Sequence, residues 1–236
     1  MFCAILTLFP DACRAYLDES ILGIAQRTGQ LQVELVNIRD FTTDRHRTAD
    51  DRPFGGGPGM VLKPEPIFEA VEDTERRHGP LRKILLCPRG ERLSQPKARE
   101  LSEEQGLLML CGRYEGFDER IRLGFTWEEI SIGDYILAGG ELASLVVLEA
   151  ATRLIPGVLG CEESAQLESF ESEFLDYPQY TRPREFRGMT VPDILLSGDH
   201  GAVDAWRQQQ AEKLTRERDN QTDTRDGPER GITNPE

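Results

Sequence analysis

Glycines that follow predicted strands are the residues of this chain best suited to contact a ligand. A glycine pair, Gly139-Gly140, stands directly before an apolar segment expected to form a helix. Glycine lets the backbone lie close against a ligand, and the first N–H groups of a helix have no partner within it. The pair therefore indicates either a turn that contacts a ligand or a tight strand-to-helix turn required only for packing.

Successive predicted strands end in loops of the same kind. Strand 82–87 is followed by Gly90, strand 107–111 by Gly112 and Gly116, and strand 127–132 by Gly133 and then the glycine pair. In open α/β sheets, ligands bind at the carboxyl ends of the strands. We therefore expect the three loops to converge on one cleft, and this convergence is more specific than any single glycine loop.

Several other chemistries are not favoured. The three histidines and five cysteines are scattered without metal-ligand spacing, so we expect no metal cluster. Cys87 and Cys111, at strand ends, are expected to be packed thiols rather than nucleophiles. Three consecutive glycines at 55–57 lie in a segment that lacks the G-x-x-x-x-G-K-[ST] pattern of a phosphate-binding loop.

The composition describes an acidic chain. Its net charge of −14 and pI near 4.8 count against a nucleic-acid partner, so such binding must rest on local basic patches or on screening by salt. An odd number of well-separated cysteines favours reduced thiols and a cytoplasmic location. The N-terminus lacks a basic secretory n-region, and no apolar run approaches the roughly 20 residues of a membrane span.

The order of predicted elements indicates an α/β fold. Strands are expected at 2–9, 31–38, 82–87, 107–111 and 127–132, with helices between them at 10–17, 19–27, 64–77, 95–104 and 117–123. A helix over 141–153 is apolar on nearly every side, which predicts burial between the sheet and another layer. Residues 39–62 form a long glycine- and arginine-containing loop, either functional or a lid without chemistry.

The chain beyond the α/β part changes in character. Residues 1–160 are expected to form one domain, followed by an acidic flexible linker over 161–174. A small, mainly helical domain is expected at 175–218, with a helix over 200–218, and residues 219–236 read as a disordered polar tail.

Long motifs in unbroken order resemble a known family. They are DDRPFGGGPGM (50–60), CGRYEGFDER (111–120), SIGDYILAGGEL (131–142), IPGVLG (155–160) and YTRPREFRGMTVPDILLSGDH (180–200). Together they resemble the bacterial tRNA (guanine-N1)-methyltransferases up to about residue 207.

The resemblance implies a SPOUT-type α/β domain with a deep trefoil knot at about 85–160, an exception to the rule against knots. It implies a homodimer whose active site combines both protomers, with S-adenosylmethionine in the knot and guanosine 37 of tRNA as substrate. The family's divalent-ion requirement leaves Mg²⁺ to consider, although no ligand cluster for it stands out.

The chemistry of guanine explains two further residues that the resemblance implies. N1 carries a proton and is a poor nucleophile until it is deprotonated, so the reaction needs a base at N1 and a donor to the charge developing on O6. By resemblance, Arg153 is the O6 donor and Glu168 the base. The family has aspartate at this place, and we expect the longer glutamate to be accommodated by the linker.

The resemblance also carries over binding residues. It places S-adenosylmethionine against Pro88, Gly90, Gly112, Arg113, Tyr114, Glu115, Gly116, Ile132, Gly133, Asp134, Tyr135, Ile136, Leu137, Gly139 and Gly140. Either Glu115 or Asp134 could offset the sulfonium charge, and core packing is the alternative role for Tyr114 and Tyr135. Contacts to tRNA are expected from Arg45, Arg47, Arg52, Arg182 and Arg184, with Asp50 ordering its loop.

Two alternative functions stay open. Because Glu168 departs from the family pattern and the chain end is charged rather than apolar, the protein could be a catalytically idle relative that binds RNA or S-adenosylmethionine. It could also be a SPOUT methylase that acts on another RNA.

Overall fold

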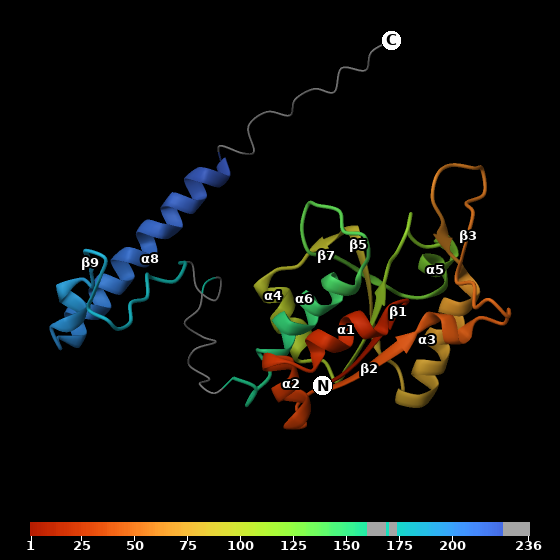
Figure 1. The fold of residues 1–236 in the computed structure, drawn as a ribbon, viewed down its shortest axis with the longest axis horizontal. Helices are drawn as coiled ribbons and strands as arrows, with labels where there is room; N and C mark the ends of the chain where they lie inside the picture. The colour runs from red at the N-terminus through yellow and green to blue at the C-terminus, as the bar shows by residue number, and fades with distance from the viewer. Residues whose placement is uncertain (160–168, 170–173, 224–236) are drawn as a thin grey trace, which may run out of the picture. The chain divides into compact units, whose positions relative to one another are not determined.

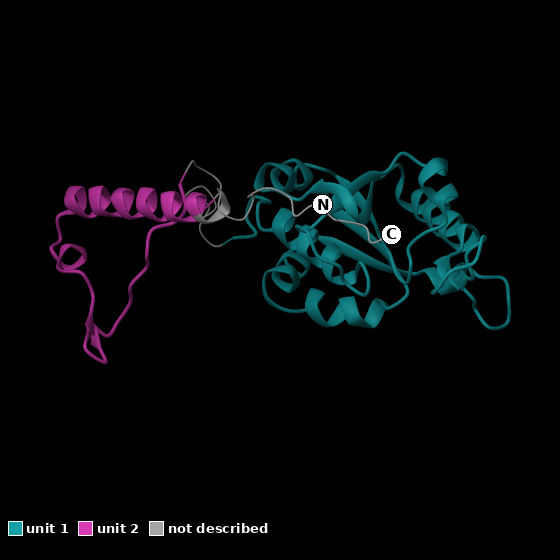
Figure 2. Ribbon diagram, turned by 90° about the horizontal axis from the view of Figure 1, so that it is seen from above, with its two compact units in different colours: residues 1–162 teal, residues 163–236 magenta. Residues whose placement is uncertain are grey.

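The computed structural model describes residues 1–159, 169 and 174–223. The chain divides into two compact units, Met1–Glu162 and Glu163–Glu236, shown in different colours in Figure 2. Each unit is described by itself below.

The first unit is built on a parallel five-stranded sheet (Figure 1). Its strands are β1 (Phe2–Thr7), β2 (Gln32–Asn37), β5 (Arg82–Arg92), β6 (Gly106–Cys111) and β7 (Glu128–Ser131), in the order β2-β1-β6-β5-β7. The central strands β1 and β6 are almost wholly buried, because a parallel sheet is covered by helices on both faces. The α/β architecture predicted from the sequence is confirmed.

Alternate side chains of the central strands enter two separate cores. Cys3 and Met109 pack with α1 (Pro10–Leu17), α2 (Ser20–Arg27), α4 (Gln95–Ser102) and α6 (Glu141–Thr152) on one face. Leu6 and Leu108 pack with α3 (Pro64–His78) and α5 (Glu119–Gly124) on the other. This alternation follows from the period of two along a strand.

The apolar helix α6 is only partly covered, which differs from the all-round burial that its sequence predicts. Leu145 and Leu148 are buried against the sheet, whereas Leu142 is 63% exposed and Val146 46% exposed. The helix therefore presents an apolar face that the single chain leaves open to solvent.

The long loop predicted at 39–62 contains short regular elements. A 3-10 turn, η1 (Ile38–Phe41), opens it, and β3 (Asp50–Asp51) pairs antiparallel with β4 (Val61–Leu62) to close its base. Strand β5 is also longer than predicted, because a register shift between Leu86 and Glu91 lets it pair a second time with β7.

The second unit contains a small antiparallel pair and one long helix. Strands β8 (Glu185–Phe186) and β9 (Met189–Thr190) form the pair, followed by the 3-10 turn η2 (Asp193–Leu196) and by α8 (His200–Asp223). The helix runs past the predicted end at residue 218 into the predicted tail, because the sequence there offers no Gly or Pro to stop it. The rest of that tail and almost all of the predicted linker lie outside the described residues.

Among the described residues, no helix is long and apolar enough to cross a membrane.

Candidate functional site

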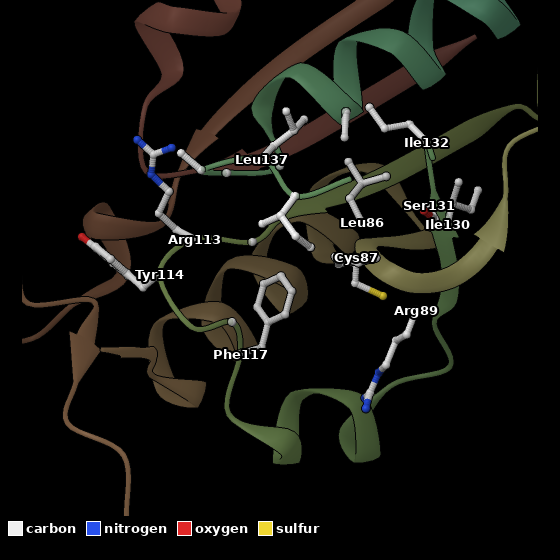
Figure 3. A pocket seen from close by; sticks show the side chains of 18 of the residues that line it. Leu86, Cys87, Arg89, Arg113, Tyr114, Phe117, Ile130, Ser131, Ile132 and Leu137 are labelled. Carbon is white, nitrogen blue, oxygen red and sulfur yellow. The ribbon is translucent and has the colours of Figure 1, made fainter. Parts of the chain in front are cut away.

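The segments predicted as three glycine-bearing loops meet at one cavity, although the first of them belongs to the long strand β5 and its Gly90 does not line the cavity. The cavity has a volume of about 610 Å³ and is lined mainly by residues 86–89 of β5, the end of β7, and the segments that follow β6 and β7. Figure 3 shows the side chains of Leu86, Phe117 and Leu137, from three different segments, around this space. The carboxyl edge of the parallel sheet thus carries a candidate ligand site.

The glycine pair lies against the backbone of the neighbouring strand end. The Gly140 N–H donates to the Gly112 carbonyl over 2.8 Å, and Arg113 forms an isolated bridge with Gly139. A Cβ on Gly140 would lie 2.8 Å from Cys111 Cα and from Gly112 N, closer than packed atoms approach. The pair is therefore required for packing, and it also lines the cavity.

Nearly all positions predicted to contact the cofactor line this cavity, the exceptions being Gly90 and Asp134. Gly90 is explained by packing, because a Cβ there would lie 2.5 Å from Ile130 N on the adjacent strand. Asp134 points outward, with 87% of its side chain exposed, and pairs with Arg92 at 3.1 Å.

The two tyrosines of the site are not core residues. Tyr114 is 46% exposed and Tyr135 55% exposed, and both line the cavity. Tyr114 has a φ of 58°, a left-handed conformation that a bulky residue seldom adopts. The structure thus rejects the alternative in which these rings fill the hydrophobic core.

Glu115 connects the cavity wall to the glycine-rich loop at 53–60. Its N–H donates to the Met60 carbonyl over 3.0 Å, and a Cβ on Gly59 would collide with its carboxylate. Gly59 has a φ of 79°, so glycine suits this position for conformation as well as for space. The loop is therefore fastened to the cavity at the turn that follows β6.

The cavity is also lined by residues that the sequence did not indicate as ligand contacts. They are Leu86, Cys87, Arg89, Phe117, Glu119, Arg122, Ile130, Ser131, Ala138 and Ala143. These residues either end the buried strands or follow them, and their pattern alone signals packing.

The charged residues among them pair with one another and with Glu129, which lies next to the cavity lining. The Arg122 guanidinium lies 3.1 Å from the Glu129 carboxylate and 3.2 Å from Glu119, and Arg89 also pairs with both carboxylates. Burial opposes ionisation of Glu129, but the Cys87 hydrogen bond and the two guanidinium groups outweigh it, so the pKa of Glu129 lies below its ordinary value. The two guanidinium groups and the two carboxylates therefore leave no large net charge at this part of the cavity wall.

Cys87 behaves as the packed thiol that the sequence predicts. Its Sγ donates to Glu129 Oε2 over 2.8 Å. Burial and the neighbouring carboxylate raise the pKa of the Cys87 thiol, which keeps it protonated at neutral pH. Burial likewise raises the pKa of Cys13 to about 11.

The structure describes only one of the two residues expected to act on the base. Arg153 caps the C-terminal end of α6, and it is absent from the cavity lining. Glu168 lies outside the described residues. Because α6 has 12 residues, its two ends are separated by roughly 18 Å at 1.5 Å per residue. Arg153 is thus remote from the glycine pair of its own chain.

The residues expected to bind tRNA fall in both units. Arg45 and Arg52 are exposed on the loop of the first unit, where Arg47 pairs with Asp40. In the second unit Arg182 precedes a cis peptide bond to Pro183, and Arg184 pairs with Asp193 at 3.0 Å.

Asp44, which the sequence did not indicate, orders part of the loop of the first unit. The Asp44 carboxylate accepts the His46 N–H over 2.8 Å and the Thr48 N–H over 2.9 Å. The Thr48 hydrogen bond is the main reason that the pKa of Asp44 lies below its ordinary value. Asp50 contributes through its backbone pairing with Leu62.

Within the part of the chain that the structure describes, no three His, Cys, Asp or Glu residues gather in a group able to hold a metal ion.

A cavity lined by glycine loops at the carboxyl ends of a parallel sheet is the arrangement in which α/β proteins bind nucleotide-like cofactors. The family described as tRNA (guanine-1)-methyltransferase TrmD matches residues 1–223, and the chain belongs to this family. It therefore methylates N1 of a guanine in tRNA, and such a methyltransferase implies S-adenosylmethionine as methyl donor.

Similar proteins support this assignment. The chain is 53% identical over 213 residues to the tRNA (guanine-N(1)-)-methyltransferase of Anoxybacillus flavithermus, covering 89% of this chain and 86% of that protein. It is 54% identical over 211 residues to the protein of the same description from Geobacillus kaustophilus, with coverage of 89% and 86%. The crystal structure of tRNA (m1G37) methyltransferase from Aquifex aeolicus superimposes with a TM-score of 0.78 at 39% identity, covering 92% and 93%.

Proposed function

We propose that the cavity binds S-adenosylmethionine and that the methylated base is guanosine 37 of tRNA, with Arg153 and Glu168 completing the site from a second protomer. The observation that carries the proposal is the glycine-lined cavity at three adjacent strand ends in a chain of this family. Since its substrate is tRNA, we place the reaction in the cytoplasm.

The cavity suits this cofactor in size and chemistry. Its volume of about 610 Å³ falls within the roughly 300–1,000 Å³ of small-molecule sites. S-Adenosylmethionine has no phosphate, so the glycines would not serve as an anion cradle. They would instead let main-chain groups of 112–116 and 132–140 reach the adenine and ribose edges, with Leu86 and Phe117 supplying apolar walls.

Glu168 and Arg153 would handle the proton on N1 and the charge that develops on O6. The cofactor supplies an electrophilic methyl group, and the chain must hold it in line with guanine N1. Glu168 would accept the N1 proton, and the Arg153 guanidinium, which keeps its charge at any working pH, would donate to O6 as negative charge develops there.

The position of Arg153 argues for a homodimer. A side chain roughly 18 Å from the glycine pair along α6 does not reach the cavity of its own chain. The same helix carries the open apolar face at Leu142 and Val146, and Ile136 beside the cavity is 78% exposed. A second copy packed on this face would cover it and could bring its own cavity to Arg153.

The chain path is compatible with the knot of the SPOUT class. From the edge strand β7 the chain returns past the carboxyl end of β6, where Gly140 bonds to Gly112. It then enters α6, which packs in the core with α1 and α4. We infer that this return segment is the part threaded through the loops that follow β5 and β6.

Single-turnover methylation of tRNA transcripts tests the proposal. A transcript with guanosine at position 37 should be methylated, and one with adenosine there should not. Glu168→Gln should lower the rate by at least the roughly hundredfold typical of losing a general base, whereas Glu168→Asp should keep most of it. Full activity of the Gln variant would remove Glu168 as base, and labelling of ribosomal RNA in preference to tRNA would indicate another substrate.

A further inference from the structure

A carboxylate outside the predicted site is buried directly behind the glycine pair. Glu141, the first residue of α6, is only 7% exposed. Burial of a carboxylate is costly unless the group is paired or hydrogen-bonded. It is absent from the cavity lining, so its burial calls for an explanation beyond direct contact with a ligand.

Two partners hold this carboxylate. The Thr7 hydroxyl at the end of β1 donates to Glu141 Oε1 over 2.8 Å, and the same hydroxyl oxygen accepts the Phe9 N–H over 2.9 Å. The second carboxylate oxygen lies 3.8 Å from Nη1 of Arg113. Glu141 therefore ties three segments together: the end of β1, the turn after β6 and the start of α6.

Gly139 lies between this carboxylate and the arginine. A Cβ on Gly139 would lie 2.5 Å from Arg113 Nη1 and would collide with the Glu141 carboxylate. Arg113 lines the cavity, with 28% of its side chain exposed, and its guanidinium stacks 4.4 Å from the centre of the Phe9 ring. The carboxylate thus lies beside the guanidinium of a residue that lines the cavity.

A cation beside the cavity acts differently on the methyl donor and on the product. S-Adenosylmethionine carries a positive sulfonium, whereas the product S-adenosylhomocysteine is a neutral thioether there. An uncompensated Arg113 would therefore disfavour the methyl donor relative to the product.

We propose that Glu141 is a positioning residue that offsets the charge of Arg113 and so lets the cavity accept the cationic methyl donor as well as the neutral product. This inference rests on the proposed cofactor site. If Glu141 had a purely structural role, its replacement would weaken the binding of both ligands equally.

Equilibrium binding of S-adenosylmethionine and S-adenosylhomocysteine by calorimetry separates the two roles. In Glu141→Gln the affinity for the methyl donor should fall relative to that for the product by on the order of tenfold, because one compensating negative charge is lost. Glu72→Gln on α3 removes the same charge from an exposed position and should leave the ratio unchanged. Thr7→Val removes the hydrogen bond to Glu141 without changing charge, and it should lower the affinity for both ligands alike.

Arg113→Gln should shift the ratio of the two affinities in the opposite direction, in favour of the methyl donor. This variant tests the proposal even if Glu141→Gln does not fold. Combined with Glu141→Gln it should restore the wild-type ratio if the two residues act on each other. A ratio unchanged in both single variants would overturn the inference while leaving the cofactor site intact. Failure of the wild-type protein to bind either ligand would instead refute the proposed function.

Discussion

Replacement of Gly140 by alanine tests whether the glycine pair is required by close packing. The new Cβ would lie 2.8 Å from Cys111 Cα and Gly112 N, whereas carbon atoms in contact ordinarily lie about 3.5–4.0 Å apart. Both neighbours are backbone atoms of a buried strand end, so they cannot turn away as a side chain does. The turn must move outward by more than about 0.5 Å, which stretches the 2.8 Å hydrogen bond from Gly140 to Gly112.

The size of the effect follows from these contacts. Overpacking of this kind costs about 1–3 kcal/mol, and the weakened hydrogen bond adds about 1 kcal/mol. A destabilisation of about 2–4 kcal/mol in a unit of this length lowers Tm by roughly 4–16 °C. Binding of S-adenosylmethionine should weaken about tenfold for each 1.4 kcal/mol that the ligand must use to restore the turn.

Thermal unfolding by circular dichroism and calorimetric binding measure both effects. Gly201→Ala is the control, because its Cβ would meet Asp199 at an ordinary 3.6 Å and alanine favours a helix. If Gly140→Ala unfolds at the wild-type temperature and binds the cofactor normally, the close approach of the two backbones is refuted.

Three further predictions concern the partners of the first unit. Phe54→Ala should raise KM for tRNA about 5- to 100-fold, because Phe54 is 98% exposed on the glycine-rich loop and its ring is available to stack on a base. Leu123 is 80% exposed on α5, and Leu123→Ala should leave this KM unchanged. Leu142→Glu should yield a monomer in analytical ultracentrifugation and abolish methylation, and a dimer of normal activity would contradict the role given to the α6 face. Because burial raises the pKa of Cys87, its modification by a thiol reagent should be slow at pH 8 and faster above pH 9, and S-adenosylmethionine should slow it further. Cys161, which lies outside the described residues, is replaced by serine so that it does not contribute to the signal. Equal rates with and without cofactor would place Cys87 outside the bound site.

The sequence determined a large part of this protein without the structure. Hydrophobic runs and strand-end glycines predicted an α/β fold and a single cleft at the carboxyl ends of its strands, because local patterns encode strands and helices. The motifs around residues 111–120 and 131–142 identified the family, and the comparisons confirm it.

Only the tertiary structure decided which role each residue of the site plays. Gly90 and Gly140 look alike in sequence, yet one packs against β7 and the other both packs and lines the cavity. Glu141 reads as an ordinary first-turn acid, and its ties to Thr7 and Arg113 join positions far apart in the chain. Side-chain partners across a fold depend on strand order and on close approach of backbones, and local sequence patterns carry neither.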